Sequence, residues 1–512
     1  MGNRNGSILV SLLLFSSLNI VNVNPQGRST TTNNARKWVQ AAIEVMGGEK
    51  TLRSLKTIKR QGTAFSNHIQ DSEHPDGPFV TIYNQPTEFV DMVNRRKQTV
   101  FNSQTQSGPK ITTTVVMDNV SASVIKSPDG KITVGPAFYA DRSWYIQSPE
   151  RAILAALDSK DLHAEPDEVT EKVLHHVVAF TWENISVHIY INSYNAYPTV
   201  VETTQVFPYD IILAPWGDVK VRATFSYWEI QPGGVHLPLQ YDIAVNGYPY
   251  RGFGITDMEI NPEFPEEPFT ASEQARKSFV PRKVADFPLG LQDKPAIEVA
   301  PGLINIPGSW YTTIVKQSDG IVIVEAPLST GYSAKVIAEA ERRFPGVPIR
   351  AVISSNNSWW HFAGVREYVA RGIPVYVMDQ NKEIIEKVLA SLHTIQPDSL
   401  SRSGKTPKLL IVSGKTVVGS GANRLEIYPI RAATQQMMMV YFPEHRLLYT
   451  SEMAQPLGPG GSFLFPHDLS TLLAAIRQEN LSVTTVIGMH MSPTPLTKVE
   501  EAVQQASAPP KS

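Results

Sequence analysis

The sequence predicts an α+β protein made of an antiparallel β domain over 35–281 followed by a layered α/β domain over 296–506. In the first part, apolar and polar residues alternate with period two between short turns, as in Val187–Ile191, which is typical of antiparallel strands. In the second part, apolar strands alternate with helical patterns, which is typical of a layered α/β arrangement. A boundary rich in proline and charge separates the parts, and we expect 282–295 to be the linker.

Composition excludes several classes of protein. The chain of 512 residues contains no cysteine and has a formal net charge of −2. Disulfides, thiolate metal ligands and a cysteine nucleophile are therefore excluded. Because nucleic-acid-binding proteins usually show a surplus of basic residues, we expect no nucleic-acid partner. Any metal ion must be bound by His, Asp, Glu, Asn or backbone oxygen.

The N-terminus combines positive charge with a short apolar run. The run Ile8–Phe15 breaks up soon afterwards, whereas spanning a bilayer takes roughly 20 apolar residues. We therefore expect residues 1–23 to be a signal peptide or an uncleaved anchor, and the protein to be periplasmic or secreted. Membrane contact is expected only if this segment stays uncleaved. The Ser/Thr/Asn-rich residues 24–34 and the tail 507–512 are expected to lack regular structure.

In the first domain, a helical pattern over 35–46 precedes the strands, and a short helix is predicted over 149–157. Strand texture and turn placement over 227–238 and 246–261 resemble periplasmic lipoprotein-carrier domains. That resemblance implies an antiparallel half-barrel closed by helices over an apolar cavity, and hence a lipid or other apolar ligand. The alternative is a plain β scaffold that positions the second domain.

Helices and strands follow one another through the second domain. Helices are predicted over 333–344, 365–371, 382–392, 469–477 and 497–505, and strands over 304–306, 312–315, 321–325, 349–353, 375–378, 408–412, 425–430, 437–442, 447–450 and 484–489. A polar loop, Ser354–Gly364, leaves the buried strand at 349–353 and enters a helix. Because α/β folds place their chemistry at such junctions, this loop is the first candidate site.

Five segments in this order resemble the metallo-β-lactamase superfamily. They are Val322–Pro327, Trp360–Val365, Met439–Pro443, Tyr449–Glu452 and Gly488–His490. The resemblance implies an αββα fold and a hydrolase-like protein. It also implies a metal site in which a His-x-His-x-Asp-His motif, further histidines and a bridging aspartate hold one or two ions.

By this resemblance, one of the two metal sites has lost all its histidines. Asn356 and Ser358 stand in place of the first two histidines of the motif, and Ala433 stands near the place of another. Trp360 replaces the aspartate of the motif, which belongs to the second site. We therefore expect a site that is at most mononuclear.

The second metal site keeps three ligands by the same resemblance: His361, Glu452 in the position of the bridging aspartate, and His490. Two histidines and a carboxylate can hold one divalent ion, zinc being the first choice, and leave positions open for water. Glu452 and His490 are also the predicted catalytic residues. In the alternative, Trp360 fills the pocket and no metal binds.

A metal-free site would leave Glu452 with His490 or His361 as an acid/base pair, close to Ser355, Ser358 or Ser451. The sequence therefore supports two predictions of function. The first is an exported hydrolase-like protein that acts on a small molecule. The second is a non-catalytic scaffold whose β domain binds a lipid or another apolar ligand.

Overall fold

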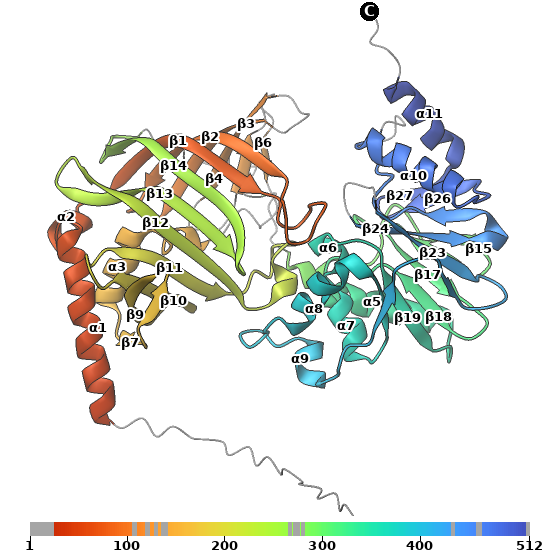
Figure 1. Cartoon of the computed structure of the whole chain (residues 1–512), viewed down its shortest axis with the longest axis horizontal. Helices are drawn as coiled ribbons and strands as arrows, with labels where there is room; N and C mark the ends of the chain where they lie inside the picture. The colour runs from red at the N-terminus through yellow and green to blue at the C-terminus, as the bar shows by residue number, and fades with distance from the viewer. Residues whose placement is uncertain are drawn as a thin grey trace, which may run out of the picture.

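The computed structural model describes residues 25–104, 110–117, 123–126, 132–134, 142–264, 269, 277, 282–431, 436–456 and 463–507. A β domain and an α/β domain lie next to each other (Figure 1). No helix among these residues has the length and apolar character that crossing a bilayer requires. The predicted signal segment 1–23 lies outside the described residues, as does all of the predicted tail except Ser507.

The β domain contains one sheet of fourteen strands among the described residues, in the order β6-β5-β4-β3-β2-β1-β14-β13-β12-β11-β10-β9-β7, with β8 paired to β9. Every pairing in it is antiparallel. The strands are β1 Thr57–Asn67, β2 Thr81–Asp91, β3 Arg96–Gln104, β4 Lys110–Met117, β5 Ser123–Lys126, β6 Ile132–Val134, β7 His163–Ala164, β8 Glu168–Thr170, β9 Val173–Trp182, β10 Ile185–Asn192, β11 Pro198–Gln205, β12 Val219–Gln231, β13 Val235–Val245 and β14 Tyr248–Ile260. The predicted antiparallel sheet is confirmed, and the half-barrel shape stays a prediction.

Two helices, α1 Pro25–Val45 and α3 Pro149–Asp158, pack against this sheet in one apolar cluster. The expectation that residues 24–34 lack regular structure was wrong, because α1 begins at Pro25. Proline suits the first helical position. Further along α1, Ala35, Val39 and Ala42 are buried at helical spacing, so packing stabilises a helix that extends back through residues of low helix propensity.

In its described residues, the α/β domain contains two sheets that pack face to face. The first has the order β15-β16-β17-β18-β19-β20-β21 and the second the order β22-β23-β24-β25-β26-β27. Their strands are β15 Ile297–Ala300, β16 Leu303–Ile306, β17 Thr312–Lys316, β18 Ile321–Val324, β19 Ile349–Ser354, β20 Val375–Met378, β21 Leu409–Val412, β22 Thr416–Val418, β23 Leu425–Ile430, β24 Met437–Phe442, β25 Leu447–Tyr449, β26 Thr485–Gly488 and β27 Met491–Pro495. Apolar side chains from both sheets form the core between them.

Helices cover the outer face of each sheet, which gives the predicted αββα layers (Figure 1). On the first sheet lie α5 Thr330–Arg343, α7 Val365–Ala370 and α8 Lys382–Ala390. On the second lie α10 Pro466–Gln478 and α11 Leu496–Ala506. Period-two alternation places Met438 in the core between the sheets and Met437 and Met439 beneath α10 and α11.

The two domains share part of one hydrophobic core. Trp359 of the α/β domain lies with its ring centroid 4.5 Å from that of Trp216 and 5.6 Å from that of Tyr248, both in the β domain. Nearby, the Asp218 carboxylate accepts hydrogen bonds from the backbone N–H groups of Thr394 (2.8 Å) and Ile395 (3.0 Å). The domains are therefore joined by apolar and polar contacts.

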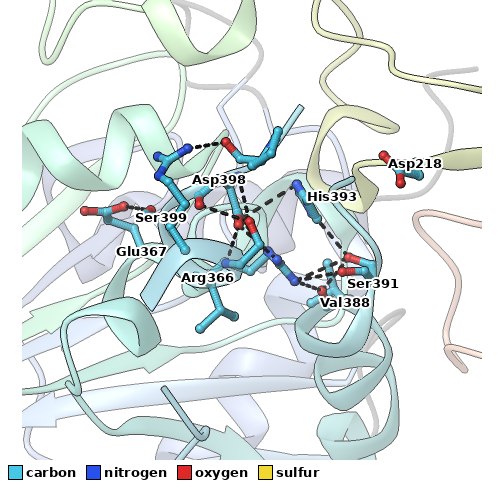
Figure 2. Close-up of polar contacts among 12 residues, drawn as sticks. Asp218, Arg366, Glu367, Val388, Ser391, His393, Asp398 and Ser399 are labelled. Atoms are coloured by element: carbon cyan, nitrogen blue, oxygen red, sulfur yellow. Dashed lines mark hydrogen bonds and ion pairs between the residues drawn. The ribbon is translucent and has the colours of Figure 1, made fainter. Parts of the chain in front are cut away.

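A hydrogen-bonded network around the ion pair of Arg366 and Asp398 lies close to this interface (Figure 2). The Arg366 guanidinium donates to both carboxylate oxygens of Asp398, at 2.6 and 3.1 Å. Its remaining nitrogen donates to the carbonyls of Val388 (2.9 Å) and Leu389 (2.8 Å), which end α8. Asp398 also caps α9 Ser399–Ser403. Burial opposes ionisation of Asp398, but Arg366 holds the pKa of this carboxyl well below its usual range.

Candidate active site

Three predicted ligands converge where strands of the two sheets end. His361 lies in α6 Trp359–Phe362, a short helix after β19, whereas Glu452 follows β25 and His490 follows β26. Because β25 and β26 are parallel neighbours, their carboxyl ends meet at one edge of the sheet. One ligand atom from each of the three residues lies within 4.8 Å of the other two. The structure thus brings together the residues that the sequence analysis selected.

Glu452 lies between the two histidines. Nε2 of His361 is 3.1 Å from one carboxylate oxygen of Glu452, and Nε2 of His490 is 3.4 Å from the other. The two imidazole centroids are 6.0 Å apart. His361 is fully buried, whereas the His490 side chain remains 16% exposed. The site therefore has a closed end at His361 and an open end at His490.

Both histidines turn Nε2 toward Glu452. Nδ1 of His490 donates to the backbone carbonyl of Ser309 at 3.0 Å, so in the neutral ring Nε2 presents a lone pair to the side of Glu452. Nε2 of His490 and both ring nitrogens of His361 are buried and have no hydrogen-bond partner among the described residues. A backbone carbonyl that fixes the distal nitrogen is the usual support of a metal-binding histidine. The donor set, with both Nε2 atoms facing the carboxylate, fits one divalent ion.

Charge coupling in the site is strong. Burial alone would lower the pKa of His361, but the adjacent Glu452 carboxylate outweighs it and raises that pKa. Burial would likewise raise the pKa of Glu452, and the two neighbouring histidines, His361 above all, lower it below its usual range instead. Glu452 is therefore a carboxylate, the form that binds a cation.

Two of the four substituted positions are now part of a hydrogen-bond chain. Nδ2 of Asn356 donates to Glu452 at 3.3 Å, and its Oδ1 accepts the backbone N–H of Ser358 at 2.6 Å. The Trp360 indole is half-buried, and its centroid lies 6.4 Å from that of His361. Ala433 lies outside the described residues. Asn356 therefore orients a ligand at a position where the family resemblance implies a histidine.

Near the site, the buried carboxylate of Glu325 was not predicted from the sequence. Glu325 follows β18 and accepts hydrogen bonds from the backbone N–H (3.2 Å) and the hydroxyl of Ser355. The Ser355 hydroxyl is 2.7 Å from that of Ser451. Burial raises the pKa of Glu325. Glu325 and Ser451 have φ values of 81° and 53°, which is strained backbone of the kind that clusters at functional sites. Glu325 could have been found from the sequence as an acidic residue directly after an all-apolar strand.

Asp71, from the other domain, also reaches the site and was missed. The Ser358 hydroxyl donates to Oδ1 of Asp71 at 2.8 Å. Burial and the neighbouring Glu452 carboxylate raise the pKa of Asp71 to about 7. Asp71 lies in the segment His68–Val80 between β1 and β2, where acidic, turn-forming residues follow a long strand. No motif in the sequence connects that segment with the second domain.

Comparisons with known proteins found similar folds among solved structures. One is the stereoselective inverting sec-alkylsulfatase Pisa1 from Pseudomonas sp., 17% identical with a TM-score of 0.32, over 42% of this chain and 41% of that one. Another is TMB-1, 15% identical with a TM-score of 0.32, over 43% of this chain and 100% of that one. A third is the metallo-β-lactamase FIM-1 from Pseudomonas aeruginosa in its mono-zinc form, 17% identical with a TM-score of 0.32, over 43% and 99%.

This chain therefore spans less than half the length of the alkylsulfatase. A scan against protein-family models found no match, and neither did a search of curated proteins. The structure is similar, at low sequence identity, to metallo-β-lactamase-fold proteins and an alkylsulfatase.

Proposed function

We propose that the chain is a hydrolase whose active site holds one divalent metal ion between His361, Glu452 and His490. The observation that supports this most directly is the convergence of one ligand atom from each of the three residues, with Nε2 of both histidines facing the Glu452 carboxylate. Two imidazoles and a carboxylate suit zinc and leave positions for water and substrate.

An ion held there supplies Lewis acidity and makes water a stronger nucleophile near neutral pH. The chain's own residues prepare the ligands for it. The Ser309 carbonyl fixes the proton of His490 on Nδ1, and Asn356 holds one oxygen of Glu452. Because His361 is buried and His490 partly exposed, substrate enters from the side of His490. This arrangement supports hydrolysis of a small molecule.

Metal content tests the proposal. Wild-type protein purified without added metal should contain about one divalent ion per chain, measured by plasma mass spectrometry. His361→Ala and His490→Ala should contain none, with circular dichroism spectra like that of wild type. His163→Ala, which removes an exposed histidine of the β domain, should keep its ion. Wild-type protein that contains no ion, and takes up none when titrated with zinc, contradicts the proposal.

The same experiment distinguishes the hydrolase from the alternative, a non-catalytic scaffold. A non-catalytic scaffold should contain no ion, and its β domain should bring a lipid-like or other apolar ligand through purification. The resemblance to lipoprotein carriers supports such a ligand, which native mass spectrometry of the full chain would detect. A metal-loaded chain without any added mass favours the hydrolase.

We also propose that the protein is exported to the periplasm or beyond the cell, on the basis of residues 1–23. The full-length chain expressed in a bacterium should be found outside the cytoplasm. N-terminal sequencing of the recovered protein would locate a cleavage, and an intact N-terminus in a membrane fraction would identify an anchor. Recovery from the cytoplasm alone contradicts export.

A further inference from the structure

The segment His68–Val80 of the β domain lies against the candidate active site. Three of its backbone carbonyls accept hydrogen bonds from the α/β domain. Gln70 accepts from the backbone N–H of Trp359 at 3.1 Å, Ser72 from the side chain of Asn357 at 2.7 Å, and Glu73 from the side chain of Gln436 at 3.1 Å. Because the acceptors are main-chain atoms, the contacts fix the backbone of this segment beside the site loop.

Further contacts hold the segment at Asp76. Asp76 forms an ion pair with Lys387 of α8 at 2.7 Å and accepts from the Tyr248 hydroxyl at 3.3 Å. The Trp359 ring packs against Trp216 and Tyr248. The segment is therefore held in place by its own domain and by the other one, as a preorganised site requires.

This placement brings Asp71 within hydrogen-bond distance of the loop that carries His361. Its hydrogen-bond partner, Ser358, stands at one of the two motif positions where the family resemblance implies a histidine. The charges of Glu452 and His361 both act on the Asp71 carboxyl. Asp71 is half-buried, so it is held by the protein and still open to a small molecule. A carboxylate from another domain thus lies beside a position where the family resemblance implies a histidine.

We propose that Asp71 is a catalytic residue of this site, supplied by the β domain, and that it accepts the proton of the attacking water. The inference rests on the proposed hydrolase function. As the water oxygen bonds to the electrophilic centre of the substrate, one proton passes from the water to a carboxylate oxygen of Asp71. The bond to the leaving group then breaks, the leaving group takes that proton, and Asp71 returns to its carboxylate form.

The geometry of Asp71 agrees with this role. Ser358 holds one carboxylate oxygen and leaves the other for water. By contrast, Asp71 is not among the three residues whose ligand atoms cluster within 4.8 Å, so it is placed to act beside a bound ion rather than as its ligand.

The test compares isosteric variants of two acidic residues on one segment. Asp71→Asn should keep its ion and its circular dichroism spectrum, and should lower kcat by about 10²–10⁴-fold with a much smaller change in KM. Asp71→Glu keeps a carboxylate and should recover part of kcat. Glu73→Gln removes the same charge two residues away, from an exposed side chain, and should leave kcat unchanged. Chromogenic phosphate, sulfate and carboxylate esters serve as probes with the zinc-loaded full chain.

Each other outcome overturns a particular claim. If Asp71→Asn keeps kcat within threefold of wild type, Asp71 is not catalytic. If it loses the ion, Asp71 is a ligand and the proposed role is wrong. If Glu73→Gln loses as much activity as Asp71→Asn, the segment acts only through its charge. If the wild type binds no ion or hydrolyses none of the probes, the proposed function fails, and the inference about Asp71 fails with it.

Discussion

Two buried charged clusters in the α/β domain differ in how completely their polar atoms are paired. Around Arg366, every guanidinium nitrogen has an acceptor, either the Asp398 carboxylate or a carbonyl at the end of α8 (Figure 2). Around Glu452, the two histidines meet the carboxylate in ion-pair contacts of 3.1 and 3.4 Å, and three of their ring nitrogens have no hydrogen-bond partner in the described part of the chain. Both clusters are buried, and each places basic side chains beside a carboxylate. In one, Arg366 lies beside Asp398; in the other, His361 and His490 lie beside Glu452.

The difference separates a structural role from a functional one. A fully paired network stabilises one conformation and has no free atom for a ligand. Buried ring nitrogens without a hydrogen bond cost stability in the absence of a ligand, and one nitrogen of each histidine can bind a cation together with the carboxylate. We therefore expect changes around Arg366 to affect stability alone, and changes around Glu452 to affect metal binding.

The largest effect on stability is expected from Asp398→Ala. It leaves the buried Arg366 guanidinium without its carboxylate partner, which typically costs about 3–5 kcal/mol. Urea unfolding followed by circular dichroism measures this loss. The variant should still contain one ion per chain. A loss below about 1 kcal/mol, or a loss of the ion, would contradict the division of roles between the clusters.

A smaller change in the free energy of unfolding is expected when zinc binds. A ligand that binds only the folded chain stabilises it by about 2.7 kcal/mol at a hundredfold excess over Kd. Urea unfolding of the metal-free wild type with and without zinc should show this gain, and Asp398→Ala should show the same gain. His490→Ala should show none. Equal stabilisation of His490→Ala would place the zinc elsewhere.

Asn356→Ala should weaken metal binding without abolishing it. Its side chain holds one oxygen of Glu452, and loss of such an outer partner typically lowers metal affinity about 10–100-fold. Competition with a chromogenic chelator measures the zinc Kd. Asn423→Ala, which removes a buried asparagine bonded to Pro301 and Lys316, is the matched control and should not change Kd. If both variants bind zinc like wild type, Asn356 does not position Glu452.

The smallest expected effect is a change with pH in the stability that Asp398 contributes. Arg366 lowers the pKa of Asp398 in the folded chain, so the carboxylate contributes stability above its unfolded pKa of about 3.9. That contribution is lost as pH falls through the folded value. The difference in unfolding free energy between wild type and Asp398→Asn should be constant from about pH 8 to 5 and shrink below about pH 4. A difference that stays constant into strong acid would show that Asp398 acts without its charge.

Periodicity predicted the α/β domain closely where strands and helices bury one regular face. Val375–Met378 and Leu425–Ile430 coincide with β20 and β23. By contrast, β27 Met491–Pro495 was missed, because Pro493 and Pro495 argue against a strand. It lies at the edge of its sheet, where proline is tolerated.

The candidate site could be predicted only in part. His361, Glu452 and His490 follow strand ends within recognisable segments, so the resemblance located them. Ser309 acts through its carbonyl, which no side-chain pattern reveals. Asp71 comes from a turn-rich segment of a different domain, and only the docking of the two domains brings it to Ser358. Contacts of that kind depend on tertiary packing.

The most direct test of the single-ion site is an X-ray structure of the protein purified in the presence of zinc, with anomalous data at the zinc edge. One peak should lie between Nε2 of His361, Nε2 of His490 and the Glu452 carboxylate, about 2.0–2.2 Å from each. No peak there, or the Trp360 ring in that position, would contradict it.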